Sequence, residues 1–95
     1  MLRDDTIEQL LEAIIVIKDK EECKNFFDDI FTIQEIEKIA QRLEAARLLI
    51  DGKTYEQVID ETSISSTTLS RISRCIRYGN GGYKKVLEKI KKPVE

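Results

Sequence analysis

The chain has 95 residues, which is the length of one small domain with a single hydrophobic core. Its composition is 41% hydrophobic, 36% charged and 6% aromatic, with four glycines and one proline. These values exclude collagen-like, disordered and membrane-embedded chains, and they favour a helix-rich domain. The longest apolar run, residues 13–17, is far shorter than the roughly 20 residues that cross a bilayer, so we expect no membrane association.

The cysteine and histidine content limits the location and the chemistry. The N-terminal residues carry two acids and no apolar core, so they do not indicate a secretory signal. Cys23 and Cys75 have no metal-ligand spacing, and the sequence contains no histidine. We therefore expect no disulfide scaffold, no metal site and a reducing, cytoplasmic location.

Charge is distributed unevenly along the chain, although the net charge is only −2. Residues 1–61 hold 8 Lys and Arg against 16 Asp and Glu, a balance of −8. Residues 62–95 hold 8 Lys and Arg against 2 Asp and Glu, a balance of +6. A basic C-terminal third on an acidic body indicates a surface that faces phosphate. The alternative is that these basic residues only cover a solvated face.

Capping residues divide the chain into helices. Three segments that begin with Thr6, Thr32 and Thr54 fit the capping box, in which the threonine and the residue three positions later exchange hydrogen bonds. Gly52 is a candidate C-cap, and residues 79–82 interrupt the chain before a last helix. The sequence therefore predicts an all-α fold with six helices at residues 5–19, 21–30, 32–51, 54–62, 65–78 and 82–92.

The first predicted helix has an unusually wide apolar stripe. At 100° per residue, six side chains fall within an arc of about 160°, and Val16 lies outside it. The six are Ile7, Leu10, Leu11, Ile14, Ile15 and Ile17. So wide a stripe on a terminal helix favours a homodimer in which this helix lies between subunits; central burial in a monomer is the alternative. On the third helix we expect a core-facing side formed by Ile36, Ile39, Ala40, Leu43, Ala46 and Ile50.

Residues 54–78 have the pattern of a helix-turn-helix. Val58, Ile59, Ile64, Leu69 and Ile72 occupy the inward positions of two helices joined by a short turn. The turn carries Ser63 where a glycine with positive φ is usual, and Ile59 stands where a small residue is usual.

The outer face of the second helix of this motif suits a major groove. Small hydroxyl side chains allow close approach, and arginines recur every three residues further along. The candidate DNA-binding residues are Ser65, Ser66, Thr67, Ser70, Arg71, Arg74, Arg77 and Lys84. We expect the hydroxyls, with Arg71, to discriminate bases, and Arg74, Arg77 and the lysines after residue 82 to contact phosphates. The alternative is a helical protein-interaction module that uses the same face and binds no specific DNA sequence.

Several segments also resemble a known family. Residues 31–35, Arg42, Gly52, residues 67–71 and residues 78–84 (Tyr-Gly-Asn-Gly-Gly-Tyr-Lys) resemble the Trp repressor superfamily, and within it the YerC/YecD-type branch. The resemblance covers about residues 25–90. It implies an intertwined homodimer whose paired recognition helices enter successive major grooves of a palindromic operator in double-stranded DNA. The implied function is that of a repressor-like regulator of transcription.

The resemblance also bears on a small-molecule effector. In Trp repressor, two arginines clamp L-tryptophan, a glycine leaves room for the indole, and a serine assists the amino group. By position, Arg42 and Arg71 match the arginines, whereas Ile72 replaces the glycine and Cys75 replaces the serine. We therefore expect no tryptophan binding and no cofactor. Arg42 and Arg71 are expected to form ion pairs, unless Arg71 contacts DNA, and a different effector stays open.

Enzymatic activity is not expected, because no residue pair suits acid–base or nucleophilic catalysis and residues 79–82 lack a phosphate-loop signature. Cys75 is expected to be a small buried residue, with redox sensing as an alternative. We expect one domain over residues 1–95. It comprises dimerisation and core helices at 1–51, the helix-turn-helix at 54–78 and a C-terminal helix at 82–92.

Overall fold

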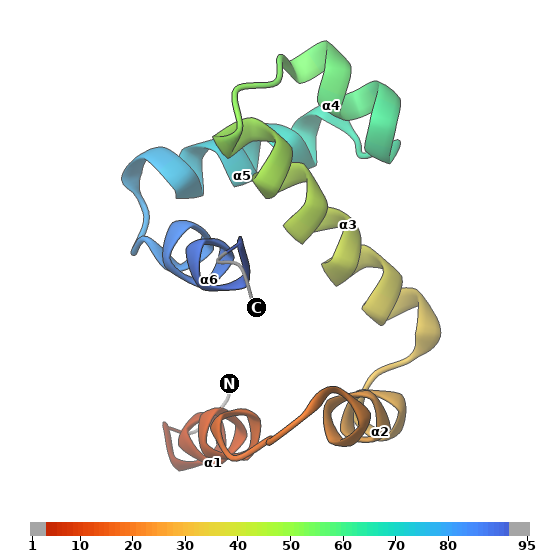
Figure 1. Ribbon diagram of the computed structural model, residues 1–95, viewed down its shortest axis with the longest axis vertical. Helices are drawn as coiled ribbons and strands as arrows, with labels where there is room; N and C mark the ends of the chain where they lie inside the picture. Colours follow the sequence, from red (N-terminus) through yellow and green to blue (C-terminus); the bar gives the residue numbers. More distant parts are fainter. Residues whose placement is uncertain (1–3, 92–95) are drawn as a thin grey trace. The chain divides into compact units, whose positions relative to one another are not determined.

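The computed structural model describes residues 4–91, which form six helices and no strand (Figure 1). The helices are α1 (Asp4–Ile15), α2 (Lys20–Ile30), α3 (Ile33–Ile50), α4 (Tyr55–Thr62), α5 (Ser66–Tyr78) and α6 (Gly82–Lys91). The predicted all-α class and all six helices are thus confirmed; residue 92 of the predicted last helix lies outside the described residues. The chain divides into two compact units, 1–36 and 37–95, with the division inside α3.

Local capping explains most of the helix boundaries. Thr32 and Glu35 form the predicted capping box, with the Thr32 amide donating to Glu35 Oε1 at 2.9 Å and the Glu35 amide donating to Thr32 Oγ1 at 3.1 Å. Thr54 and Gln57 form the second one, at 2.9 and 3.2 Å. The expectation for Thr6 was wrong, because α1 already begins at Asp4 and places Thr6 inside its first turn.

The first helix ends earlier than predicted, at Ile15 instead of residue 19. The β-branched run from Ile14 to Ile17 has low helix propensity. Asp19 then caps the next helix, since its side chain accepts a hydrogen bond from the Glu22 amide at 2.9 Å. Ile17, predicted as part of the stripe on the first helix, therefore lies in the connection to α2.

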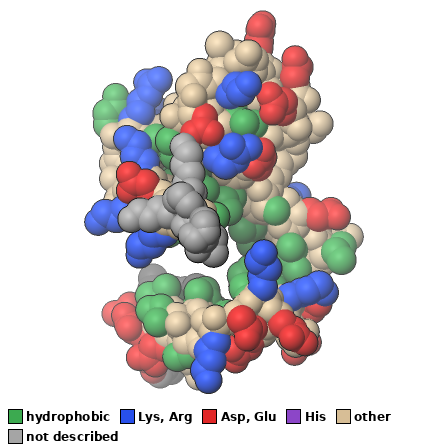
Figure 2. Space-filling view, viewed as in Figure 1, with side chains coloured by type: hydrophobic (Ala, Val, Ile, Leu, Met, Phe, Trp, Pro, Cys, Tyr) green, Lys and Arg blue, Asp and Glu red, His purple; other side chains and the backbone are tan. Residues whose placement is uncertain are grey.

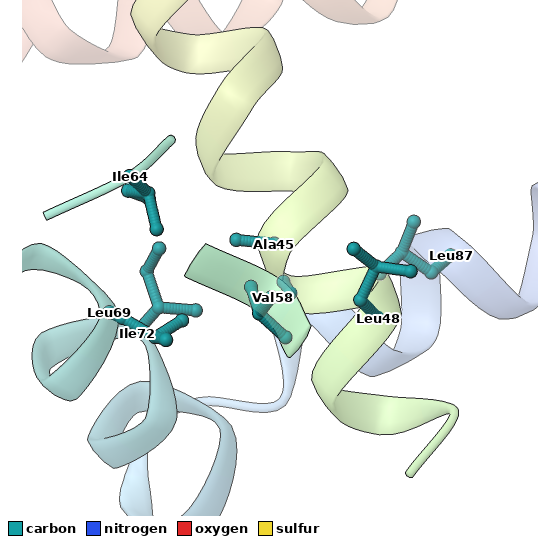
Figure 3. Packing of buried hydrophobic residues seen from close by; sticks show 8 residues of the cluster. Ala45, Leu48, Val58, Ile64, Leu69, Ile72 and Leu87 are labelled. Carbon is teal, nitrogen blue, oxygen red and sulfur yellow. The ribbon is translucent and has the colours of Figure 1, made fainter. Parts of the chain in front are cut away.

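The buried core of the described residues lies entirely in the unit of residues 37–95. Its eight hydrophobic members are Ala45, Ala46, Leu48, Val58, Ile64, Leu69, Ile72 and Leu87. Figure 3 shows Ile64, Leu69 and Ile72 on one side of α3, and Leu48 facing Leu87 of α6. Ala45 and Ala46 are completely buried in this core, where a methyl side chain adds little thickness between helix backbones.

The expected core face of α3 was largely wrong. Of its six predicted members only Ala46 is buried, whereas Ile39, Leu43 and Ile50 are 46%, 37% and 36% exposed. The side that packs against α4, α5 and α6 carries Ala45 and Leu48 instead. The apolar residues of α3 therefore extend onto a side of the helix that the chain's other described helices do not cover.

In the other unit, α1 and α2 contain no buried residue. Ile7, Leu10, Leu11 and Ile14 of the α1 stripe are between 40% and 48% exposed. Ile7 and Leu10 line a hollow of about 490 Å³, together with Thr6, Gln9, Ala13, Phe26 and Ile30. Hydrophobic side chains of this unit are visible at the surface in Figure 2. This unit leaves its apolar face uncovered by its own residues.

Two ion pairs of Arg47 link the side chains of the last turns of α3 and the residue that follows it. The Arg47 guanidinium contacts the carboxylates of Glu44 at 2.7 Å and Asp51 at 3.2 Å. The hydrogen bond from Arg47 lowers the pKa of the Glu44 carboxyl, against a smaller opposing effect of burial. Among residues 4–91, no helix is long and apolar enough to cross a membrane.

Candidate nucleic-acid interface

The helix-turn-helix consists of α4, a turn at residues 63–65 and α5 (Figure 1). Val58 and Leu69 are completely buried, and Ile64 and Ile72 are 3% exposed, so these four inward positions are confirmed. Ile59 is half-buried and packs against the same cluster. Ile64 lies in the turn itself and fills the space between α3 and α5 (Figure 3). Apolar packing thus fixes the backs of both helices and leaves the other side of α5 to solvent.

The turn adopts the left-handed conformation that the sequence pattern predicted. Ser63 has φ 62° and ψ 18°, and its amide donates to the Ile59 carbonyl oxygen at 2.8 Å. A side chain with a Cβ is strained in this region, which is why glycine is the usual residue there. The serine at position 63 therefore costs stability without changing the form of the turn.

Hydrogen bonds of Thr62 hold the turn in place. The Thr62 hydroxyl donates to the Val58 carbonyl oxygen at 2.7 Å and accepts from the Ile64 amide at 3.2 Å. The Thr62 carbonyl oxygen accepts from Nε2 of Gln41 on α3 at 2.6 Å, in a half-buried position. Sequence reasoning missed Gln41, because a partner 21 residues away leaves no local signal.

The predicted outer face of α5 is exposed throughout. This applies to Ser65, Ser66, Thr67, Ser70, Arg71, Arg74 and Arg77, and also to Lys84 on α6. Small hydroxyl side chains therefore occupy the N-terminal half of the face and arginines the C-terminal half. Such an arrangement fits the edges of bases at one end and phosphates at the other.

Ser65 already has a structural role within this face. Its hydroxyl accepts from the Thr68 amide at 3.1 Å and donates to Thr68 Oγ1 at 2.9 Å, so Ser65 is the N-cap of α5. Ser66, Thr67 and Ser70 are free of such bonds among residues 4–91. The hydroxyls available to a ligand thus lie within the first turn and a half of α5.

The arginines of the face have no acid on their own helix, whereas Lys84 on α6 lies four residues before Glu88. Helix α5 contains three arginines and no acid, and α6 adds further lysines. In Figure 2, Lys and Arg side chains gather at the left edge of the upper part, where Figure 1 draws the end of α5 and α6. A positive field at this edge attracts polyanions.

Arg42 and Arg71 do not form the ion pairs expected from the sequence. Both side chains are exposed, and neither takes part in an ion pair within residues 4–91. Glu44, the acid nearest to Arg42 along α3, is paired with Arg47. Two uncompensated guanidinium groups are thus available to an anionic ligand.

The two residues that depart from the Trp repressor pattern differ in burial. Ile72 packs in the core, whereas Cys75 is exposed, so the expectation that Cys75 is buried was wrong. Cys75 follows Arg71 by one helical turn and therefore shares its solvent-facing side. Among residues 4–91, no cluster of three His, Cys, Asp or Glu side chains could hold a metal ion.

A hollow beside α5 was also missed from the sequence. Its volume is about 320 Å³, and it is lined by Leu49, Lys53, Tyr55, Ser73, Ile76 and Arg77. Of these only Arg77 was a predicted site residue. The lining comes from the end of α3, the following loop, the start of α4 and the last turns of α5. No single sequence window contains these segments.

The fold and this face together define a helix-turn-helix protein of the Trp repressor type. The family model described as Trp repressor protein matches residues 5–91. The uncharacterized protein YerC of Bacillus subtilis (strain 168) is 48% identical over 90 residues, which are 95% of this chain and 86% of YerC. This chain belongs to the Trp repressor family.

Solved structures agree with this assignment. A TrpR-like protein from Eubacterium eligens ATCC 27750 superposes with a TM-score of 0.88 at 38% identity, covering 99% of this chain and 97% of that one. A candidate Trp repressor from Staphylococcus aureus superposes with a TM-score of 0.88 at 33% identity. The match covers 98% of this chain and 93% of the Staphylococcus aureus chain. The resemblance inferred from the sequence motifs is confirmed.

Proposed function

We propose that this protein is a homodimeric, sequence-specific, repressor-like DNA-binding regulator of transcription that acts in the cytoplasm and is not an enzyme. The observation that carries the proposal is the outer face of α5. Hydroxyl residues and arginines are exposed there, while Leu69 and Ile72 anchor the opposite side of the helix. Membership in the Trp repressor family supports the same function.

The charge pattern supports DNA as the partner. A net charge of −2 conceals a basic segment, and α5 contributes three exposed arginines and no acid to it. Phosphate contacts from Arg74, Arg77 and Lys84 would supply most of the affinity, and Ser66, Thr67, Ser70 and Arg71 would read bases. Binding should therefore weaken steeply as salt rises.

The uncovered apolar surfaces support a homodimer. Helices α1 and α2 bury no residue, and exposed apolar side chains continue along α3 at Ile39, Leu43 and Ile50. Large contiguous apolar surfaces are rare on monomers and common at obligate interfaces. A second copy would cover them and place two recognition helices on one palindromic operator.

We further propose that tryptophan does not regulate binding. Cys75 stands where the family has a serine for the amino group, and a thiol is a weak hydrogen-bond partner. Ile72 stands where the family has glycine, so α5 carries a branched side chain at that position. Arg42 and Arg71 would be free for another anionic effector or, in the case of Arg71, for DNA.

The proposal is tested by separating base readout from phosphate contacts. Ser66→Ala and Ser70→Ala should change the preferred DNA sequence, whereas Arg74→Ala should weaken binding to all sequences alike and reduce the salt slope by about 1. Lys24→Ala on α2 removes an exposed lysine far along the chain and serves as the control. A protein-interaction module would show none of these effects on DNA.

A further inference from the structure

The hollow of about 320 Å³ beside α5 combines an apolar floor with a polar rim. Leu49 and Ile76 form the floor and pack against the core cluster. Lys53, Tyr55, Ser73 and Arg77 complete the lining, so residues that carry two cations and two hydroxyl groups line the same space. Ammonium, guanidinium and hydroxyl groups are the donors that bind a phosphate group.

The hollow adjoins the outer face of α5. At 100° per residue, Arg77 lies within about 20° of Ser66 around the helix axis, and Ser73 lies about 20° beyond Ser66 on the other side. The hollow thus borders the edge of the face that carries Ser66 and Ser70. A helix seated in a major groove has a phosphate backbone along each edge, so a phosphate would lie beside this hollow.

Ser73 has the geometry of a prepared donor. The residue is only 9% exposed, yet among residues 4–91 its hydroxyl has no hydrogen-bond partner. No side-chain oxygen or nitrogen in this part of the chain is both fully buried and unpaired, so the Ser73 hydroxyl is reached from the hollow. Its free donor is unusual, because buried polar groups generally find partners within the protein.

The lysine that lines the hollow, Lys53, is partly neutralised by Glu61. Lys53 Nζ lies 4.0 Å from Glu61 Oε2, with side-chain exposures of 44% and 49%. This is the outer limit of an ion pair, and such exposed pairs are weak. The Lys53 ammonium is therefore held near α4 by a contact that a stronger anion can replace.

We propose that this hollow binds a backbone phosphate of double-stranded DNA. Lys53 and Arg77 supply the positive charge, the Ser73 and Tyr55 hydroxyls donate hydrogen bonds, and Glu61 competes with the phosphate for Lys53. The inference rests on the proposed DNA-binding function and adds a contact outside α5, from the loop between α3 and α4. This contact would fix the angle at which α5 enters the groove.

Salt titrations of DNA binding by the full chain test the proposal. Lys53→Gln should reduce the slope of log affinity against log salt by about 0.9, the value for one lost phosphate contact. Tyr55→Phe and Ser73→Ala should weaken binding to all duplexes alike. Tyr55→Phe removes one hydroxyl from a residue that is 40% exposed, so the fold should stay intact. Lys24→Gln, which neutralises an exposed lysine on α2, should leave the slope unchanged.

The most discriminating test is a variant that should bind DNA more tightly than the wild type. Glu61→Gln should tighten binding to every duplex about twofold to fivefold at low salt by releasing Lys53. Glu56→Gln makes the same charge change on α4 without an ion pair to break, so a smaller gain is expected there. Equal gains from the two variants would contradict the role of Glu61.

The remaining outcomes separate this inference from the function on which it rests. A wild-type chain that binds no duplex overturns the proposed function, whereas wild-type binding with unchanged slopes for Lys53→Gln and unchanged affinity for Tyr55→Phe overturns only this contact. Inorganic phosphate, titrated without DNA and followed by the amide resonances of residues 53, 55 and 73, distinguishes a free anion. Saturation with a Kd below 1 mM (a binding free energy more favourable than about −4 kcal/mol) would show a site for free phosphate instead.

Discussion

Gln41 Nε2 donates a hydrogen bond to the Thr62 carbonyl oxygen across 2.6 Å, joining the middle of α3 to the end of α4. The acceptor precedes Ser63, whose left-handed backbone turns the chain toward α5. Gln41 lies two residues from Ile39 and from Leu43, so it is on the other side of α3 from these exposed apolar side chains. One side chain thus connects α3 to the turn that orients α5.

Replacing Gln41 by leucine should loosen the turn more than the fold. The variant leaves the Thr62 carbonyl without its donor at a half-buried site, which should lower the free energy of unfolding by about 1 kcal/mol. Amide hydrogen exchange should quicken at Ile64, and affinity for the preferred operator should fall more than affinity for random DNA. Gln34→Leu, at an exposed position on the same helix, is the control. Equal losses for operator and random DNA would show that Gln41 does not position α5.

The first and last residues of the turn, Ser63 and Ser65, should respond to substitution with opposite changes in stability. Ser63→Gly relieves the strain of a left-handed residue and should raise the free energy of unfolding by about 0.5–1 kcal/mol. Ser65→Ala removes the N-cap of α5 and should lower it by about 1 kcal/mol. Urea denaturation of both variants measures the difference. A loss of stability in Ser63→Gly would contradict the conformation of the turn.

The apolar stripe of α1 should be required for assembly. Ile14 is 42% exposed, and Ile14→Asp would place a charge within the proposed subunit interface, so the variant should sediment as an 11.0 kDa species. Val16→Asp makes the same change outside the stripe at a side chain that is 67% exposed, and this variant should stay dimeric. Wild-type protein that sediments at 11.0 kDa at micromolar concentration would refute the homodimer.

Tryptophan should leave the protein unchanged. A ligand present at 100 times its Kd stabilises the folded state by about 2.7 kcal/mol, which a thermal melt detects readily. With millimolar tryptophan we expect neither a rise in melting temperature nor a gain in operator affinity. Glycine at the same concentration controls for solvent effects. A clear shift with tryptophan alone would mean that Cys75 and Ile72 are compatible with the indole site.

Features governed by short-range interactions could be predicted from the sequence. The capping boxes at Thr32 and Thr54 depend on residues three positions apart, and the inward residues of α4 and α5 follow helical periodicity. The positive φ at Ser63 followed from the form of the turn. The motif and its outer face therefore needed no knowledge of the whole fold.

Features that depend on distant or external surfaces could not be predicted in this way. The periodicity of α3 records every apolar surface, so it could not separate Ala45 and Leu48, which are buried within the chain, from Ile39 and Leu43, which are not. Cys75 was misplaced because residue type suggested burial, although its helical position places it beside Arg71. The hollow at Ser73 is assembled from separate segments.

Selection of bound sequences from random duplex DNA tests the central claim most directly. The full-length protein should be used at about 150 mM salt, where non-specific phosphate binding is weak enough for base readout to dominate. We predict enrichment of one palindrome whose half-sites lie about 10 base pairs apart or a multiple of that spacing. Recovery of no enriched sequence would contradict a sequence-specific regulator and would favour a protein partner for the outer face of α5.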